Sequence, residues 1–196
     1  MQYFKLRITE EKRVWKNYFI FAERFLFKGN EILFSDAYTQ KTILDNLKIQ
    51  ALNNQGDIVK NQDYFMKEKE SFFCKIRNVF LIREDIFKEE SFKYSNGVEF
   101  FTVKVDGEFE YSYKLLSFTN VVDCVNWEKS MRTQFDFSSK LILAEQKIPK
   151  DIDGFFLSGW HRYGQYNSII NEKLKNSLLE LEKASEFLLF DKVDYK

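Results

Sequence analysis

The chain has 196 residues, of which 44% are hydrophobic and 31% charged, and its 30 basic side chains balance 30 acidic ones. Zero net charge gives no general attraction to nucleic acid or to an anionic membrane, and 22 Phe, 10 Tyr and 3 Trp provide more apolar surface than a disordered chain carries. We therefore expect a folded protein whose partner is not nucleic acid.

The N-terminal residues 1–12 carry closely spaced charges and lack the apolar core of a signal peptide. No apolar run approaches the roughly 20 residues that a membrane-spanning helix needs. Cys74 and Cys124, with His161 as the single histidine, match neither a zinc-binding pattern nor a disulfide framework. These features predict a cytoplasmic protein with no membrane segment, no metal and no cofactor.

Patterns of β-prone and apolar residues predict short strands at 3–8, 17–22, 24–34, 72–82, 140–145, 154–160 and 186–193. The strongest strand signal is a hairpin, because residues 98–105 and 108–118 flank Asp106-Gly107, a pair that suits a type I′ turn. One face of this hairpin is expected to carry Phe101, Val103 and Val105 opposite Phe109, Tyr111 and Tyr113.

The clearest helix is expected at 172–184, where Asn171 can cap the first turn and Leu174, Leu178 and Leu181 form an apolar stripe. A weaker pattern predicts a helix at 37–52. The fold class is therefore α+β, a mostly antiparallel sheet with a few packed helices and one clear helix near the C-terminus. Because no stretch has the composition of a linker, we expect a single compact domain over residues 1–196.

Any catalytic arrangement must be built around His161. Cys124 can be drawn as a nucleophile with His161 as base, but residues 121–125 are typical of a buried strand end, where an apolar setting raises the pKa of a thiol. No glycine-rich phosphate-binding motif is present. We therefore predict no catalytic residues.

Residues 155–166 contain the densest group of residue types favoured at protein interfaces. Gly159 and Gly164 bracket a predicted loop, whose candidate partner-binding residues are Trp160, Arg162, Tyr163 and Tyr166. The alternative is that these aromatic side chains enter the core.

A second candidate surface is the acidic segment 83–110, with four basic and eight acidic residues. Its Glu108 and Glu110 share one face of the predicted hairpin, and such charges can steer association with a basic partner. The alternative is that this segment compensates the basic residues 1–30, which carry seven basic and three acidic side chains.

Two parts of the C-terminal half resemble a known family. Residues 122–130 read Val-Asp-Cys-Val-Asn-Trp-Glu-Lys-Ser, and residues 168–178 are followed by an apolar segment at 187–193. In this order they are similar to the immunity proteins of bacterial polymorphic toxin systems, most closely the family numbered eleven, with its pattern V-D-x-[LV]-D-W-x-x-S, a helix start I-x-V-S-E-x-L-K-x-x-L and a last F-x-x-V strand. The resemblance covers residues 98–193, and residues 1–97 have no recognised counterpart.

Three positions depart from that pattern. Asn126 stands where an aspartate is commoner, Asn171 stands where a serine cap is commoner, and Glu182-Lys183-Ala184-Ser185 replaces a glycine-containing turn. Because asparagine caps helices as serine does, the helix at 172 is expected to survive. Residues 123–130 are expected to form a structural corner, with Asn126 capping a short turn and Trp127 filling the core.

The resemblance implies a cytoplasmic protein that binds a cognate toxin domain and blocks it by occlusion, without chemistry of its own. The alternative is a small-molecule-binding domain or an enzyme with a pocket walled by residues 160–166. A third interpretation is a self-associating module.

Overall fold

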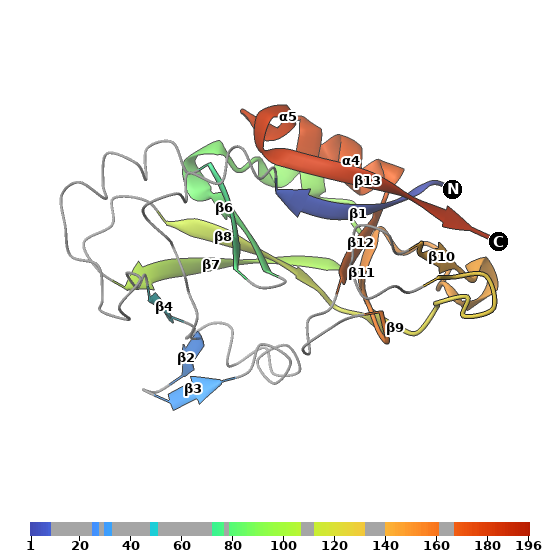
Figure 1. The fold of residues 1–196 in the computed structure, drawn as a ribbon. Helices are drawn as coiled ribbons and strands as arrows, with labels where there is room; N and C mark the ends of the chain where they lie inside the picture. The colour runs from blue at the N-terminus through green and yellow to red at the C-terminus, as the bar shows by residue number, and fades with distance from the viewer. Residues whose placement is uncertain are drawn as a thin grey trace.

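The computed structural model describes residues 1–8, 25–27, 30–32, 48–50, 72–76, 79–106, 112–131, 140–160 and 167–196, drawn in colour in Figure 1. Two sheets dominate this part of the chain, one with six strands and one with seven, and the helices are few and short. Three strand pairs are parallel (β10 with β13, β11 with β9, β4 with β7), and the other described pairs are antiparallel. The predicted α+β class, mostly sheet, is confirmed.

The six-stranded sheet has the order β10-β13-β1-β12-β11-β9. Its strands are β1 (Tyr3–Ile8), β9 (Val121–Val122), β10 (Ile142–Leu143), β11 (Gly154–Leu157), β12 (Asn167–Asn171) and β13 (Leu188–Tyr195). Strand β1 is central, because Phe4 lies opposite Lys192 of β13 on one side and opposite Ile170 of β12 on the other. The first and last strands of the described chain are thus neighbours, as Figure 1 shows.

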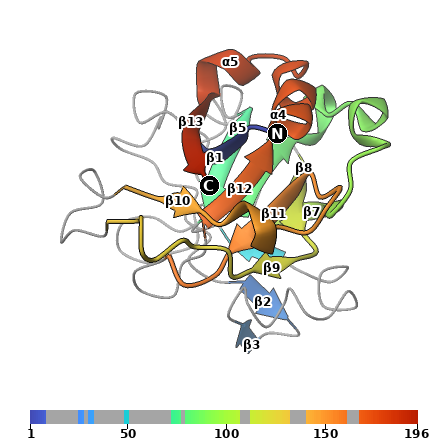
Figure 2. The same cartoon turned by 90° about the vertical axis from the view of Figure 1, so that its right-hand side faces the viewer.

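A short chain segment connects the two edges of this sheet. At one edge, Val121 and Val122 pair with β11; three residues later, Val125 forms a bridge with Leu143 of β10 at the other edge. The Ala144 N–H also donates to the Cys124 carbonyl at 2.7 Å. The sheet is therefore closed through residues 121–126, the yellow chain that runs from β9 toward β10 in Figure 2.

The seven-stranded sheet has the order β3-β2-β4-β7-β8-β6-β5. Its strands are β2 (Phe25–Phe27), β3 (Asn30–Ile32), β4 (Lys48–Gln50), β5 (Phe73–Ile76), β6 (Val79–Arg83), β7 (Val98–Asp106) and β8 (Tyr113–Phe118). The predicted strands at 24–34 and 72–82 are each two antiparallel strands.

The hairpin of β7 and β8 exists, but its predicted two-residue turn is wrong. Such a turn would set Val103 opposite Glu110, whereas the structure pairs Val103 with Tyr113. The observed register puts Phe101 directly opposite Leu115, and both side chains are buried. Burial of one apolar face fixes the register here and overrides the local Asp-Gly signal.

Of the other predicted segments, some are strands in the structure and one is not a helix as expected. Strand β1 has the predicted bounds, β10, β11 and β13 fall on predicted segments, and β9 falls within residues 121–125, which were expected to be a buried strand end. Strand β12 was not predicted. The predicted helix at 37–52 is contradicted at Lys48–Gln50, which is strand β4 paired with β7. The strand expected at 17–22 lies outside the described residues.

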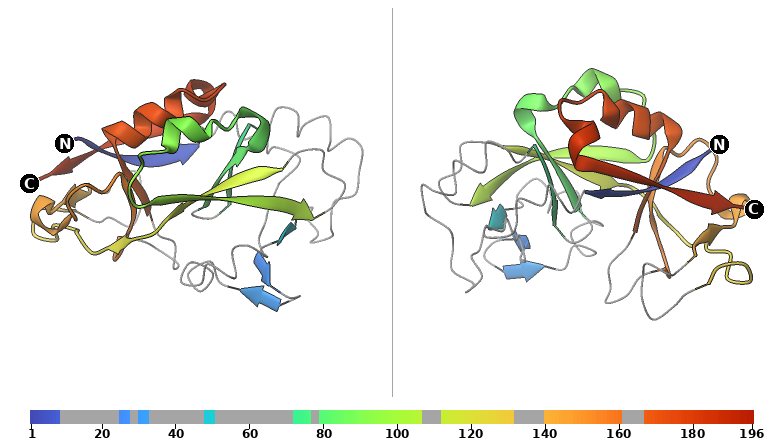
Figure 3. Two further views of the ribbon diagram at one scale, coloured as in Figure 1. Left: turned by 180° about the vertical axis from the view of Figure 1, so that it is seen from behind. Right: turned by 45° about the horizontal axis from the view of Figure 1, so that its top comes forward.

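The helical segments are η1 (Glu84–Ile86), η2 (Glu89–Phe92), η4 (Glu145–Lys147), α4 (Glu172–Leu179) and α5 (Ala184–Phe187). As predicted, the Asn171 side chain caps α4 by accepting a hydrogen bond from the Leu174 N–H at 2.9 Å. The helix is shorter than expected: it ends at Leu179, and the left-handed conformation of Lys183 (φ 62°) comes before the separate helix α5. Figure 3 shows α4 beside the green η1 and η2 segments. Within the described residues, no helix is long and apolar enough to span a membrane.

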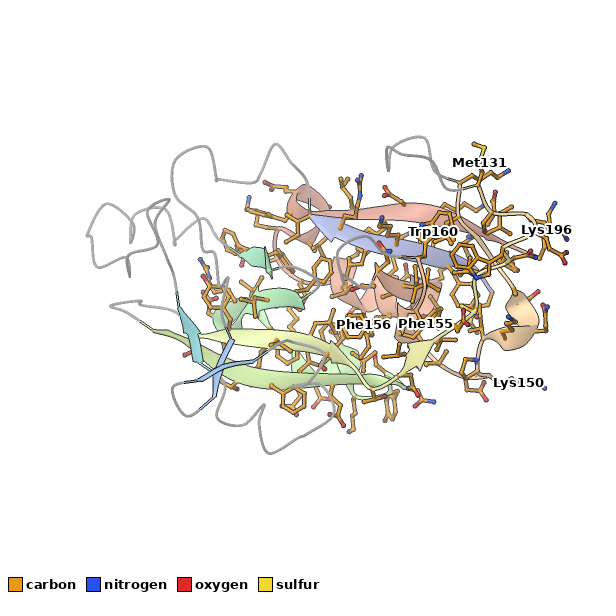
Figure 4. The ribbon with its side chains drawn as sticks, turned by 60° about the horizontal axis from the view of Figure 1, so that its bottom comes forward. Met131, Lys150, Phe155, Phe156, Trp160 and Lys196 are labelled. Carbon is orange, nitrogen blue, oxygen red and sulfur yellow. The ribbon has the colours of Figure 1, made fainter. Side chains whose placement is uncertain are left out.

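The two faces of the six-stranded sheet contribute to two hydrophobic cores. One face of the six-stranded sheet packs against α4 and the seven-stranded sheet and forms the helix-side core. This core includes Phe4, Leu6, Leu115, Phe118, Phe156, Ile170, Leu174 and Leu178. The closed-sheet core lies on the other face and includes Tyr3, Val122, Cys124, Val125, Leu143, Phe155, Leu157, Trp160, Ile169 and Val193. Figure 4 labels Phe155 and Phe156, neighbours on β11 that belong to different cores because successive strand residues point to opposite faces.

Candidate functional site

The segment that closes the six-stranded sheet continues into a tight turn at residues 126–130. The Asn126 carbonyl accepts a hydrogen bond from the Ser130 N–H at 2.8 Å, and the Asn126 side chain accepts one from the Lys129 N–H at 3.3 Å. The prediction that Asn126 caps a short turn is confirmed. The same Lys129 N–H also donates to the Asn126 carbonyl at 3.3 Å, so the cap adds a second acceptor to a turn that the backbone already closes.

The far end of this turn is attached to β10. The Ser130 hydroxyl donates to the carbonyl of Ile142 and accepts from the N–H of the same residue, both at 3.0 Å. Met131 and Lys140 then exchange two backbone hydrogen bonds, at 2.8 and 2.7 Å. The near end is anchored by Cys124 and Val125, which are buried. The turn is therefore held at both ends.

Trp127 lies in this turn and is 50% exposed. Its ring centroid is 5.7 Å from that of Trp160, which is only 9% exposed and belongs to the closed-sheet core. The prediction that Trp127 fills the core is wrong. Trp160 was a candidate partner-binding residue, but the structure places it in the core, which is the alternative given above. The exposed ring of Trp127 packs against this buried ring.

Gly159 allows the Trp127 ring to lie close to the backbone that follows β11. Its φ is 79°, a conformation that residues with a side chain rarely adopt, and a Cβ at this position would lie 3.3 Å from the Trp127 ring. The sequence pattern predicts Gly159 at one end of a loop that presents Trp160. In the structure, this glycine makes room for the other tryptophan.

Among the described residues, the exposed large hydrophobic side chains are Met1, Tyr94, Val121, Trp127, Met131 and Leu179. Three of them lie in the eleven-residue segment 121–131, with Val121 48% and Met131 56% exposed. We call the turn at residues 126–130, with its exposed Trp127 side chain, the Trp127 surface. Figure 4 shows Met131 pointing away from the body of the protein.

A buried polar cluster around Asp153 has a structural role, because its carboxylate is fully hydrogen-bonded. The buried carboxylate of Asp153 accepts from the Asn96 N–H, the Lys173 ammonium and the Asn171 side-chain amide, each at 2.7 Å. These bonds connect the start of α4 to the chain before β7. Because a buried charge is tolerated only when it is paired and hydrogen-bonded, this cluster stabilises the fold.

Cys124 is fully buried, and burial, with a smaller contribution from the charge of Asp123, raises its pKa to about 12. At neutral pH its side chain is a protonated thiol, which is a poor nucleophile. The expectation that Cys124 is a core residue is confirmed. In the described part of the chain, no group of three or more His, Cys, Asp or Glu residues is placed to hold a metal ion.

The other predicted site residues lie outside the described residues, and their assignments stay predictions. They are Glu108, Glu110, Arg162, Tyr163 and Tyr166, together with His161. In the acidic segment, two carboxylates have local partners: Glu84 pairs with Lys114 at 3.0 Å, and Asp85 pairs with Arg83 at 2.6 Å.

Sequence reasoning missed the exposure of Trp127. The signal was present, because Trp127 stands between Asn126 and Glu128-Lys129-Ser130, without the alternation that marks a buried strand residue. A tryptophan among polar residues in a predicted turn indicates a half-exposed ring.

Comparison with protein-family models finds no match for this chain, and comparison with the sequences of curated proteins finds none. The resemblance to immunity family eleven stays a prediction from residues 122–130, 168–178 and 187–193. What the geometry defines is a fixed turn that presents an aromatic side chain.

Proposed function

We propose that this chain is an immunity protein that binds and neutralises the toxin domain of a bacterial polymorphic toxin system, acting by occlusion in the cytoplasm. The observation that carries the proposal is the half-exposed ring of Trp127, held on a fixed turn and supported by the buried Trp160. Tryptophan is enriched among the residues that dominate protein–protein binding energy. A contact surface that is already ordered loses less conformational entropy on binding.

Two departures from the family pattern are compatible with this proposal. Asn126 and Asn171 stand where aspartate and serine are commoner, and both make the capping hydrogen bonds that those residues would make. The differences therefore preserve the local structure on which the resemblance depends.

The state of Cys124 favours binding over thiol chemistry. A catalytic cysteine needs a lowered pKa and access to substrate, and Cys124 has neither. The exposed groups of the turn, Glu128 and Lys129, carry opposite charges. This mixed surface fits a protein partner better than a polyanion.

The proposal is tested with the C-terminal domain of the secreted toxin whose gene adjoins that of this chain, called here the neighbouring toxin domain. The domain is co-expressed with the wild-type chain, Trp127→Ala or Leu179→Ala, and both bacterial growth and the dissociation constant are measured. Leu179 is the matched control, because it is also an exposed apolar residue (39%) but lies on α4.

We expect the wild-type chain to form a complex and restore growth. Trp127→Ala should raise the dissociation constant by about 30-fold or more, the size of a hot-spot effect, and Leu179→Ala should leave it within about two-fold. A wild-type chain that neither binds the neighbouring toxin domain nor restores growth contradicts the proposal.

A further inference from the structure

We infer that Ser130 is a positioning residue for the Trp127 surface: its hydroxyl holds the turn in the conformation that binds the partner. The inference rests on the proposed function and adds to it the residue that fixes the geometry of the binding surface. Its basis is the set of hydrogen bonds that join the turn to Ile142.

Both ends of the turn are attached to the same residue of β10. The Ile142 carbonyl accepts from the Asn126 N–H at 2.9 Å and from the Ser130 hydroxyl at 3.0 Å. A carbonyl oxygen has two lone pairs, so it can accept both bonds. Trp127 lies between these two attachment points and is therefore constrained from both sides.

The side chain of Ser130 is needed because its backbone N–H is already used. That N–H donates to the Asn126 carbonyl and closes the turn. The hydroxyl takes over the pairing with β10, as it both accepts from the Ile142 N–H and donates to the Ile142 carbonyl. An alanine at this position would remove both bonds and leave the Ile142 N–H without its Ser130 acceptor.

Loss of this attachment changes the turn more than the core. Cys124 and Val125, just before the turn, keep their buried packing, and Trp160 stays in the closed-sheet core. The Trp127 ring then has more than one orientation, and a partner must order it on binding. This cost weakens the complex by about ten-fold, the scale of one or two hydrogen bonds.

The experiment compares Ser130→Ala, Ser130→Thr and Leu178→Ala. Threonine keeps the hydroxyl, and Leu178→Ala destabilises the helix-side core without touching the turn. Two quantities are measured: the width of the Trp127 indole N–H signal in proton–nitrogen NMR spectra, assigned by its loss in Trp127→Phe, and the dissociation constant for the neighbouring toxin domain.

We expect Ser130→Ala to broaden the Trp127 indole signal and to raise the dissociation constant about ten-fold. Ser130→Thr should keep both quantities near wild type, within about two-fold in binding. Leu178→Ala should lower the melting temperature while the indole signal and the binding of the folded protein stay unchanged.

Binding of Ser130→Ala with wild-type affinity overturns the inference, as does equal weakening by Leu178→Ala, which would reduce the effect to general stability. If Trp127→Ala weakens binding and Ser130→Ala does not, the proposed function stands and only the role of Ser130 fails. A wild-type chain that does not bind the neighbouring toxin domain refutes both.

Discussion

The two faces of the six-stranded sheet are covered in different ways. On the helix side, α4 lays Leu174 and Leu178 over side chains such as Phe156, and the second sheet completes the cover. On the other side, the sheet covers itself, because residues 121–126 connect its two edges and enclose the second core. Trp127 follows this closing segment directly and lies exposed in the turn at residues 126–130.

This difference assigns the stability of the fold and the binding of a partner to different residues. The helix side is covered by several elements, so its residues contribute to the free energy of unfolding and offer little to a partner. On the closed side, the inner residues of segment 121–126 belong to the core, together with residues such as Ile148 and Ile152, and the turn that follows the segment is exposed. Four predictions test this difference between the two sides through the free energy of unfolding, in order of decreasing effect.

Phe156→Ala should have the largest effect, on the helix side. Phe156 is buried, and its ring meets that of Phe118 edge-on with centroids 5.0 Å apart. The free energy of unfolding should fall by about 4 kcal/mol, the cost of a large cavity. Denaturant titration measures this change, and a loss below about 1 kcal/mol would show that the helix-side core is not packed as described.

Trp160→Ala and Trp127→Ala should differ although their rings are in contact. Trp160 is in the core, so its removal should cost about 3 kcal/mol of unfolding free energy, whereas removal of the half-exposed Trp127 should cost less than about 1 kcal/mol. The same denaturant titration compares the two variants. Equal losses would mean that Trp127 is a core residue, and the distinction between the two sides would fail.

High pH should destabilise the closed-sheet core. Burial raises the pKa of Cys124 to about 12 in the folded protein, well above the ordinary range of a thiol, so the unfolded chain loses this proton first. The free energy of unfolding should therefore fall as pH rises above about 9, by about 2 kcal/mol between pH 9 and pH 11.

Cys124→Ala is the control for this effect. It should remove most of the dependence on pH and leave a smaller one of the same sign from Tyr3, whose pKa is also raised, chiefly by burial. A stability profile between pH 9 and pH 11 that is the same in both proteins would contradict the burial of Cys124.

Lys183→Gly should have the smallest effect, and it should stabilise the protein. Lys183 has a φ of 62°, which costs a residue with a side chain about 1 kcal/mol. Glycine removes this strain and gives up only an exposed ion pair with Glu186, so a net gain of about 0.5 kcal/mol is expected from thermal unfolding. Asp151→Gly, at a φ of 64°, is the comparison: it should gain less, because aspartate tolerates this conformation better, and an equal gain would argue against strain at Lys183.

Local features of the fold could be predicted from the sequence. The cap at Asn171 and the turn at Asn126 each depend on atoms within four residues of each other, and the apolar alternation of residues 3–8 matches the bounds of β1. The inertness of Cys124 followed from its apolar neighbours. These predictions needed no knowledge of distant parts of the chain.

Features set by distant pairing could not be predicted. Strand β4 lies in a segment with a helical pattern and is a strand because it pairs with β7, more than 50 residues away. The hairpin register followed buried partners such as Phe101 and Leu115, and not the Asp-Gly pair. The burial of Trp160 depends on the closure of the sheet at Val125, which no local pattern indicates.

Hydrogen exchange of the chain, alone and with the neighbouring toxin domain, tests most directly the claim that the partner binds at the closing segment. The exchange of backbone amides in residues 119–131 is compared with that in α4, which serves as the internal reference on the helix side. The account predicts that the toxin domain slows exchange in residues 119–131 and leaves that of α4 unchanged. Protection of α4 with no change in residues 119–131 would place the binding surface on the helix side and contradict it.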